Sequence, residues 1–337
     1  MAETVPFVDL AHDYHVVGDD VRERFDRILG LQCFVGGDQT VELESRLAQL
    51  TGAHAVACSS GSDALYLALR SAGIGPGDAV IVPAFTFFST AGAVVRAGAV
   101  PVFADVDTAT LMLGPRELEK TLSDRFVRDG ERLVERSSRA PLAAAIVVHL
   151  FGRAAPVADL SALLAEVGRA MLVEDAAQAI GAGTSSGRVG AGELVCFSFY
   201  PTKNIGGAGD GGAVTTSSEA RAHRIRVLRN HGAGADPYVH DECGINARIG
   251  ELAAALVNAK LARLEEWTRA RGRLAALYHE QLGGLERRGR LRRPVPAAAP
   301  ECVWHQYTLR LPEGRDRVAA SLGAAGVDTR IFYPLPL

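Results

Sequence analysis

Short apolar runs rich in β-branched residues alternate with segments of helical periodicity from about residue 56 to residue 216. The runs predicted to be strands are Ala79–Val82, Val100–Val106, Ala143–His149, Met171–Asp175, Leu194–Phe199 and Ala213–Thr216. Between them, helices that end at or near a glycine are expected at Ser62–Ala72, Ser89–Ala97 and Val157–Gly168. This alternation predicts an α/β fold with a mostly parallel, doubly wound central sheet.

The pattern changes after about residue 245. Arg248 to about Leu282 keeps helical periodicity with almost no glycine or proline, which predicts one long helix. Beyond it, Trp304–Leu311, Asp316–Gly323 and Asp328–Tyr333 are predicted as strand, helix and strand. We therefore expect a large domain at 1–245, with an N-terminal arm, and a small α+β domain at 246–337.

One segment of the large domain stands apart by its charge. Ser123–Arg139 is dense in acids and arginines, and we interpret it as a solvated surface helix or loop without chemistry.

Composition and charge narrow the classes of partner. The 337 residues are 48% hydrophobic and 22% charged with a formal net charge of −3, so no electrostatic feature favours nucleic acid. The N-terminus lacks a basic segment followed by an apolar one, and no apolar run approaches the ~20 residues that span a bilayer. The five cysteines form no C-x-x-C pair and no metal-ligand spacing. We expect a cytoplasmic protein without a metal or membrane segment, whose cysteines are buried free thiols.

The chain has three lysines among many arginines. Lys120 and Lys260 occupy helical segments and are expected at the surface, whereas Lys203 lies in SFYPTKNIGGAGDGGAV, just past a buried strand. A primary amine is required to form a reversible imine with an aldehyde, and the imine needs space for substrate exchange. The glycines after Lys203 are expected to provide that space.

The same glycines match another motif, the dinucleotide-binding pattern G-x-G-x-x-G, at Gly207, Gly209 and Gly212. In that motif the glycines open a helix, whereas here they lead into the strand-like run Ala213–Thr216. The context disfavours a nicotinamide site.

A carboxylate that could pair with Lys203 ends an earlier strand. Asp175 in MLVEDAAQAIGA lies at the carboxyl end of an α/β strand, where ligands usually bind. A carboxylate held against a pyridine nitrogen keeps that nitrogen protonated, which lets the ring stabilise a carbanion. Taken alone, Asp175 could equally cap the helix that follows.

A phosphate could bind where SSGSDA precedes the helix DALYLALRSAG. The amides of a helix N-terminus, together with the hydroxyls from Ser59 to Ser62, form an anion site. A plain serine N-cap explains the same residues.

Taken in order, the motifs resemble the DegT/DnrJ/EryC1/StrS family of sugar aminotransferases from about Val5 to Leu337. They are VPFVDL, SSGSDALYLAL, GDAVIVPAFTFFST, VPVFADVD, VVHLFG, VEDAAQAIGA, SFYPTKNIGGAGDGGAV, RNHG, GINARIGELAAA and WHQYTLR. The resemblance implies the type I, aspartate aminotransferase-like fold and the cofactor pyridoxal 5'-phosphate.

The resemblance also assigns roles to single residues. Lys203 should form the internal aldimine and then shuttle protons, and Asp175 should pair with the pyridine nitrogen. Gln178 should lie on the side of the ring's phenolic oxygen. For the other cofactor contacts it implies the Ser198 side chain and the amides of Ser62 and Asp63 at the phosphate, Phe87 stacked on the ring, and Asn246 reaching the phosphate from the other subunit of a homodimer.

The family resemblance further implies a reaction. Members that act at C3 of the sugar read SFYPTKN with GDGGA, as this chain does, whereas members that act at C4 tend to read SFHATKN with GEGGA. We therefore expect transfer of an amino group, with glutamate as the donor, to a nucleotide-linked keto sugar, favoured as dTDP-3-keto-6-deoxyhexose. Tyr200 is a candidate to face the sugar, and a buried tyrosine packed beside the cofactor is the alternative.

Alternatives remain at the level of function. They are a 4-keto sugar aminotransferase and a non-catalytic protein of the same fold. Sugar dehydratases that share the cofactor replace the lysine by histidine, so Lys203 argues against them. Two departures from the family are Ser62, where threonine is usual, and the end at YPLPL, where the family usually continues, so the small domain is expected to be shorter than usual.

Overall fold

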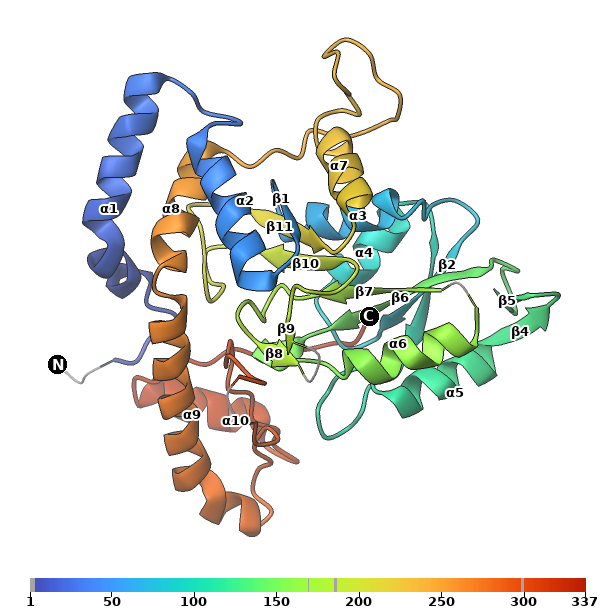
Figure 1. Ribbon diagram of the computed structural model, residues 1–337. Helices are drawn as coiled ribbons and strands as arrows, with labels where there is room; N and C mark the ends of the chain where they lie inside the picture. Colours follow the sequence, from blue (N-terminus) through green and yellow to red (C-terminus); the bar gives the residue numbers. More distant parts are fainter. Residues whose placement is uncertain (1–3, 169, 185–186, 298–299) are drawn as a thin grey trace.

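A computed structural model describes residues 4–168, 170–184, 187–297 and 300–337. Its centre is a seven-stranded sheet of order β1-β11-β10-β7-β6-β2-β3 (Figure 1). The strands are β1 His54–Cys58, β2 Ala79–Pro83, β3 Val100–Ala104, β6 Leu142–Val148, β7 Met171–Asp175, β10 Val195–Ser198 and β11 Gly212–Thr216.

The sheet is mostly parallel, as the sequence predicts. β11 pairs antiparallel with both β1 and β10, whereas the pairs β10–β7, β7–β6, β6–β2 and β2–β3 are parallel. Each strand predicted in the large domain is confirmed within a few residues of its expected bounds. β1 was not predicted, because three of its five residues are alanine or cysteine rather than β-branched.

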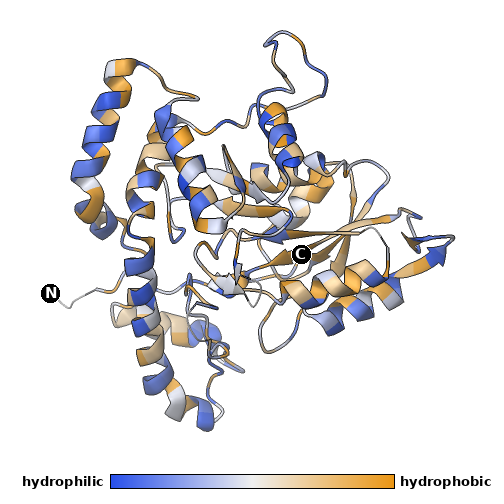
Figure 2. Cartoon of the chain, in the orientation of Figure 1, coloured by the Kyte–Doolittle hydropathy of each residue, from blue (hydrophilic) through white to orange (hydrophobic). Residues whose placement is uncertain are grey.

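Helices cover both faces of the sheet (Figure 1). Alternate strand residues contribute to different clusters: Val56 and Val80 pack with the helices of one face, and Ala57 and Ile81 with those of the other. The first face carries α3 Gly61–Ser71, α4 Ser89–Arg96 and α7 Glu219–Leu228, and the second carries α2 Asp38–Thr51, α5 Pro115–Arg125, α6 Val157–Glu166 and α8 Glu251–Leu261. Figure 2 shows the apolar sheet between helices whose outer surfaces are largely hydrophilic.

The single long helix expected from Arg248 to Leu282 is wrong. The chain forms α8 and then α9, Leu264–Arg287, with a break at Ala262 and Arg263. After the break, Leu264 is buried against Gly181 of the loop that follows β7. The helical periodicity of the sequence continues through the break, so tertiary packing accounts for the change of direction.

The C-terminal region contains the predicted helix, α10 Arg315–Ala324, but neither predicted strand. Within the described part of 290–337, extended segments make only isolated bridges, such as Arg292 with Arg310 and Val327 with Val5. These segments pack without forming strands: Val303, just before Trp304–Leu311, is buried in one core cluster, and Tyr333 packs on another.

The charged segment Ser123–Arg139 is largely a β-hairpin, not the expected helix or loop. Strands β4 Phe126–Asp129 and β5 Arg132–Glu135 pair antiparallel. Glu135 is buried and accepts hydrogen bonds from the amides of Ser137 and Ser138, at 2.9 and 2.6 Å. These hydrogen bonds fix the turn that follows β5. The density of charged residues along the sequence does not predict them.

The remaining short elements are β8 Gly183–Thr184, β9 Gly187–Arg188 and the 3-10 turn η1 Leu150–Gly152. Two cysteine predictions are wrong, because Cys33 and Cys243 are exposed, whereas Cys58, Cys196 and Cys302 are buried. Among the helices of the described residues, none has the length and apolarity to cross a bilayer.

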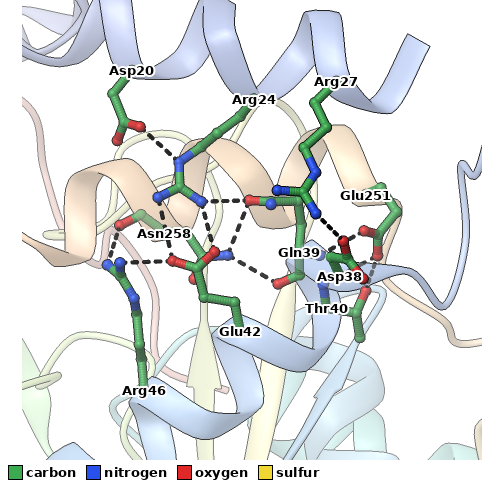
Figure 3. A network of polar contacts seen from close by, with 10 residues as sticks. All are labelled: Asp20, Arg24, Arg27, Asp38, Gln39, Thr40, Glu42, Arg46, Glu251 and Asn258. Carbon is green, nitrogen blue, oxygen red and sulfur yellow. Dashed lines mark hydrogen bonds and ion pairs between the residues drawn. The ribbon is translucent and has the colours of Figure 1, made fainter. Parts of the chain in front are cut away.

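Helix α1, Leu10–Leu31, joins α2 and α8 through a polar network (Figure 3). Arg24 donates to Gln39 and Glu42, at 2.7 and 2.8 Å. Lys260, expected at the surface, is buried and pairs with Asp13 of α1 at 3.1 Å. This lysine therefore fixes the N-terminal helix α1 to α8.

Candidate active site

Strand β7 ends in two buried carboxylates that point to opposite faces of the sheet. On one face, Glu174 contacts the fully buried His149 at 2.9 Å. On the other, Asp175 accepts from Thr90 Oγ1 at 2.8 Å and from the Ala177 amide at 3.2 Å. The described residues that follow Asp175, 176–184, form turns and a short strand without a helix, so helix capping does not explain its place.

Lys203 lies after β10, the strand next to β7. Its amide donates to the Tyr200 carbonyl at 2.8 Å, and the Gly207 amide to the Phe199 carbonyl at 2.7 Å, which closes a compact turn. Burial lowers the pKa of Lys203, and the charge of Asp175 opposes that effect. Burial likewise raises the pKa of Asp175, against the hydrogen bond from Thr90 and the charge of Lys203. The charge of each of the two predicted residues therefore opposes the effect of burial on the pKa of the other.

Glycines near Lys203 and at the start of α3 allow close backbone approaches. A Cβ at Gly206 would lie 2.1 Å from the Pro201 carbonyl oxygen, and one at Gly212 would lie 2.4 Å from the Ser60 carbonyl. A Cβ at Gly61 would lie 2.6 Å from Ser198 Cβ. These glycines fold the turn and let the start of α3 approach the end of β10. Nothing lies within 4 Å of a Cβ placed at Gly209, and the space expected for substrate exchange stays a prediction.

The start of α3 supplies hydroxyls and amides, as expected. Ser60 caps the helix by accepting from the Asp63 amide at 3.0 Å, so the capping interpretation is confirmed, while the phosphate site stays a prediction. Ser62 Oγ lies 2.7 Å from Ser89 Oγ at the start of α4. The hydroxyls of Ser62 and Ser89 lie at the starts of α3 and α4, and the Ser198 side chain lies at the end of β10. Strand β10 is the neighbour of β7, which ends at Asp175.

Asp63 has a structural role that the sequence did not reveal. Its carboxylate accepts from Ser59 and Ser60 and forms an ion pair with Arg96 of α4. Because the Asp63 amide already donates to Ser60, the assignment of that amide to a phosphate stays a prediction.

Aromatic side chains line the remaining side. Phe87 is 58% exposed, and its ring centroid lies 6.3 Å from that of Tyr333. Gln178 accepts from the Phe151 amide at 2.6 Å and donates to Tyr333 Oη at 3.3 Å. Burial raises the pKa of Tyr333 to about 12, so its hydroxyl stays protonated at neutral pH. Tyr200 is 52% exposed, so the other residues of its own chain do not bury it.

Sequence reasoning missed three contributors. Ser89 and Thr90 belong to the quoted motif TFFST, yet only the fold brings them to Ser62 and Asp175. Tyr333 is distant in sequence from every other site residue, and only its YPLPL motif marks it.

Asn246 is not brought into contact with the other predicted residues. It is exposed, and its Oδ1 accepts from Arg248 Nη2 at 2.9 Å. The next residue, Ala247, accepts from the Ser59 amide at 2.9 Å, which ties the segment to the end of β1.

A model of the DegT/DnrJ/EryC1/StrS aminotransferase family matches residues 16–337. The chain belongs to this family. One relative is UDP-N-acetyl-3-dehydro-alpha-D-glucosamine 3-aminotransferase of Acidithiobacillus ferrooxidans, 40% identical over 334 residues, 98% of this chain and 84% of the relative. Another is dTDP-3-amino-3,4,6-trideoxy-alpha-D-glucose transaminase of Streptomyces venezuelae, 40% identical over 342 residues, 100% of this chain and 84% of the relative.

The fold of a solved family member agrees. The S. venezuelae aminotransferase DesV superposes with a TM-score of 0.89 at 38% identity, covering 99% of this chain and 84% of the other. The chain is therefore an aminotransferase of the type I fold, and its cofactor is pyridoxal phosphate.

The side chains at the site fit that cofactor. A buried carboxylate suits a pyridine nitrogen, a lysine of lowered pKa suits an aldehyde, and hydroxyls at a helix start suit a phosphate. The exposed Phe87 ring offers a face for an aromatic ring.

Proposed function

We propose that this aminotransferase converts a nucleotide-linked 3-keto sugar to the 3-amino sugar, with glutamate as the amino donor. The favoured substrate is a dTDP-3-keto-6-deoxyhexose. The pairing of Lys203 with Asp175 at the edge of the sheet carries the reaction type. The motifs around Tyr200 and Asp210 support C3, and two relatives have names that specify an amino group at carbon 3 of a nucleotide sugar.

In the proposed site, Ser62 and Ser198 hold the phosphate, Asp175 faces the ring nitrogen and Phe87 covers the ring. The amide of Asp63 and the side chain of Gln178 complete the contacts at the phosphate and at the phenolic oxygen. When bound, the cofactor supplies an electron-withdrawing ring that carries the amino group between donor and sugar. Thr90 helps to keep Asp175 ionised, because its hydrogen bond opposes the effect of burial.

Lys203 is the proposed base and acid. Because burial lowers the pKa of Lys203, a larger fraction of its amine is neutral near pH 7 than for an exposed lysine. A neutral amine accepts a proton from a substrate carbon and returns it at another atom. Asp175 limits the fall in pKa, so the amine can hold the proton between the two steps.

Reduction with borohydride tests the covalent role of Lys203. We expect the yellow protein to lose its colour and the mass of the reduced cofactor to appear on the peptide that contains Lys203. Lys203→Ala should carry no such mass, whereas Lys120→Ala, which changes an exposed lysine, should behave as wild type. Bound cofactor at another lysine, or none, contradicts the proposal.

The substrate is tested with the protein first converted by glutamate to its amino form. Among nucleotide-linked sugars, the 3-keto compounds are expected to restore the original spectrum, and the 4-keto compounds to react more slowly. Faster reaction with 4-keto sugars favours the C4 alternative. A protein that keeps its spectrum with every donor tried favours a non-catalytic role.

The site is proposed to be completed by a second copy of the chain, whose Asn246 reaches the phosphate. Asn246 is exposed and contacts none of the predicted site residues of its own chain, which is compatible with this arrangement.

A further inference from the structure

Two buried threonine hydroxyls lie in series behind the carboxylate of Asp175. Thr90 Oγ1 lies 2.8 Å from Asp175 Oδ2, and Thr86 Oγ1 lies 3.0 Å from Thr90 Oγ1. Thr90 is fully buried and Thr86 is 2% exposed, so bulk water does not compete for either hydroxyl. Thr86 comes from the loop between β2 and α4, and the reaction proposed above gives it no role.

The direction of both hydrogen bonds follows from the carboxylate. An ionised carboxylate can only accept, so Thr90 must donate its single hydroxyl hydrogen to Asp175. Thr90 then has only lone pairs to offer to Thr86, so Thr86 must be the donor in the second contact. The two hydrogen bonds therefore form a relay that runs from Thr86 through Thr90 to the carboxylate.

The other oxygen of the same carboxylate also has a fixed donor. The Ala177 amide donates to Oδ1 at 3.2 Å, while Thr90 donates to Oδ2. One donor on each oxygen, from the loop after β7 and from α4, sets the orientation of the Asp175 carboxylate. A hydroxyl that itself accepts a hydrogen bond is polarised and becomes a stronger donor, so Thr86 strengthens the hydrogen bond from Thr90.

We propose that Thr86 is a positioning residue for Asp175 and acts through Thr90 as the outer donor of this relay. The inference rests on the proposed function, in which Asp175 faces the ring nitrogen of the cofactor. The relay favours the ionised carboxylate and holds it in one orientation. Thr86 also directly precedes Phe87, the proposed cover of the ring, so the relay joins the segment that carries Phe87 to the acid on β7.

Other ionisable groups act on Asp175 from the elements around it. Burial, the largest effect, raises the pKa of Asp175, whereas the charges of Lys203, after β10, and His149, after β6, lower it. Cys196 of β10 and Tyr333 are neutral near pH 7, because burial raises the pKa of Tyr333 to about 12 and that of Cys196 well above its usual value. The threonine variants leave these side chains in place, so a shift between variants reports on the hydroxyls.

The experiment follows the protonation of Asp175 in the full-length protein after its cofactor has been removed. The infrared C=O stretch of protonated carboxyl groups is recorded from about pH 4 to about pH 9, and its midpoint gives the pKa. Asp175→Asn identifies the band that belongs to Asp175. Return of the yellow colour on addition of pyridoxal 5'-phosphate shows that each threonine variant keeps an intact site.

Valine replaces the hydroxyl of threonine by a methyl group of similar size. Thr90→Val should raise the midpoint for Asp175 by about one pH unit, because a hydrogen bond to a charged group is lost. Thr86→Val should raise it by about 0.3 pH unit, because the bond from Thr90 weakens. Since Thr86 acts through Thr90, adding Thr86→Val to Thr90→Val should cause no further rise.

Thr51→Val is the matched control and should leave the midpoint for Asp175 unchanged. Thr51 is buried, and its hydroxyl donates to the Leu47 carbonyl of its own helix at 2.8 Å. The control therefore removes a buried threonine hydroxyl without touching the relay.

An unchanged midpoint in Thr86→Val would overturn the inference. An equal rise with and without the Thr90 hydroxyl would also overturn it, because a purely structural effect of Thr86 does not depend on Thr90. Thermal unfolding reports on folding, and alanine replaces valine at a position where the valine variant does not fold. Reduction with borohydride separates the two proposals. Cofactor absent from Lys203 refutes the proposed function, and with it this inference, whereas cofactor on Lys203 with unchanged midpoints refutes this inference alone.

Discussion

Burial acts in opposite directions on the two ionisable residues at the centre of the site. It raises the pKa of Asp175 and lowers that of Lys203, so each loses charge unless the other, or a hydrogen bond, opposes the effect. Thr90 donates to Asp175 and is the largest of the opposing effects on that carboxyl. The carboxylate is thus stabilised by its fixed neighbours before any ligand binds.

Replacing Asp175 by asparagine tests that charge. Asp175→Asn keeps the size of the side chain but cannot hold a proton on a ring nitrogen, so we expect turnover to fall by about 10³-fold. Borohydride should still fix the cofactor to Lys203, because the lysine is retained. Asp124→Asn, at an exposed ion pair, is the matched control and should leave turnover unchanged. Turnover within tenfold of wild type in Asp175→Asn contradicts the role.

Single residues of the site were predictable where a motif and a strand end coincide. Lys203, Asp175 and Ser198 follow from such positions, and the structure brings them to one edge of the sheet. Thr90 and Tyr333 did not follow, because their contacts with Asp175 and Gln178 join positions 85 and 155 residues apart in the chain. Their partners depend on strand order, which local pattern does not contain.

At the scale of elements, helix α2 begins without a side-chain cap of its own. Glu251, at the start of α8, accepts from the amides of Gln39 and Thr40 at 2.8 and 3.1 Å (Figure 3). A Cβ at Gly37 would lie 2.8 Å from that carboxylate, so glycine before the helix leaves room for the Glu251 side chain. The Glu251 carboxylate therefore accepts the free backbone amides in the first turn of α2, which lies more than 200 residues away in sequence.

Removing this carboxylate should destabilise the protein. Glu251→Ala leaves buried amides without an acceptor, and we expect the free energy of unfolding to fall by about 2 kcal/mol. Urea denaturation measures the change. Glu265→Ala, at an exposed position in the first turn of α9, should change it by less than about 0.5 kcal/mol. Equal effects of the two substitutions would refute the capping role.

The hairpin β4–β5 gives a pH dependence. Hydrogen bonds, above all from the Ser138 amide, hold the pKa of Glu135 below its usual value. A lowered folded-state pKa contributes stability that is complete above the unfolded value, about 4.5, and is lost as pH falls through the folded value. Glu135→Gln should therefore be less stable than wild type at pH 7, and the gap should narrow below about pH 4.5. A gap of constant size between pH 7 and 3 contradicts this.

Elements were predicted best where periodicity and glycine agree, as in β2, β7 and α4. The errors occur where packing overrides the pattern: at the break before Leu264, and in the hairpin closed by Glu135. The extended segments after residue 300 read as strands because they are apolar on one side, yet they pack on the large domain without forming a ladder.

At the scale of the whole molecule, the proposed dimer makes a specific complementation prediction. If Asn246 acts across the interface, homodimers of Lys203→Ala chains and homodimers of Asn246→Asp chains should both have low activity. Mixed dimers then contain one site with both changes and one with neither. Random reassociation should restore about a quarter of wild-type activity, because half of the dimers are mixed and each has one intact site.

Size-exclusion chromatography with light scattering gives the oligomeric state of each mixture. Recovery of activity in a monomeric mixture, or none in a dimeric one, contradicts a shared site. A mixture of Lys203→Ala and Lys120→Ala chains is the control. Its activity should come only from the Lys120→Ala chains, which retain Lys203.

The two acids that end β7 also constrain how the chain can fold. A shift of one residue in the pairing of β7 with β10 would turn Glu174 toward Thr90 and leave Asp175 facing His149. Such a chain would retain a carboxylate on each face and an apolar strand, yet under the proposed function the longer side chain of Glu174 would occupy space that the cofactor ring needs. The register of this one strand therefore matters for function as well as for folding. A molecule with β7 shifted by one residue could be compact and yet lack the yellow colour of bound cofactor.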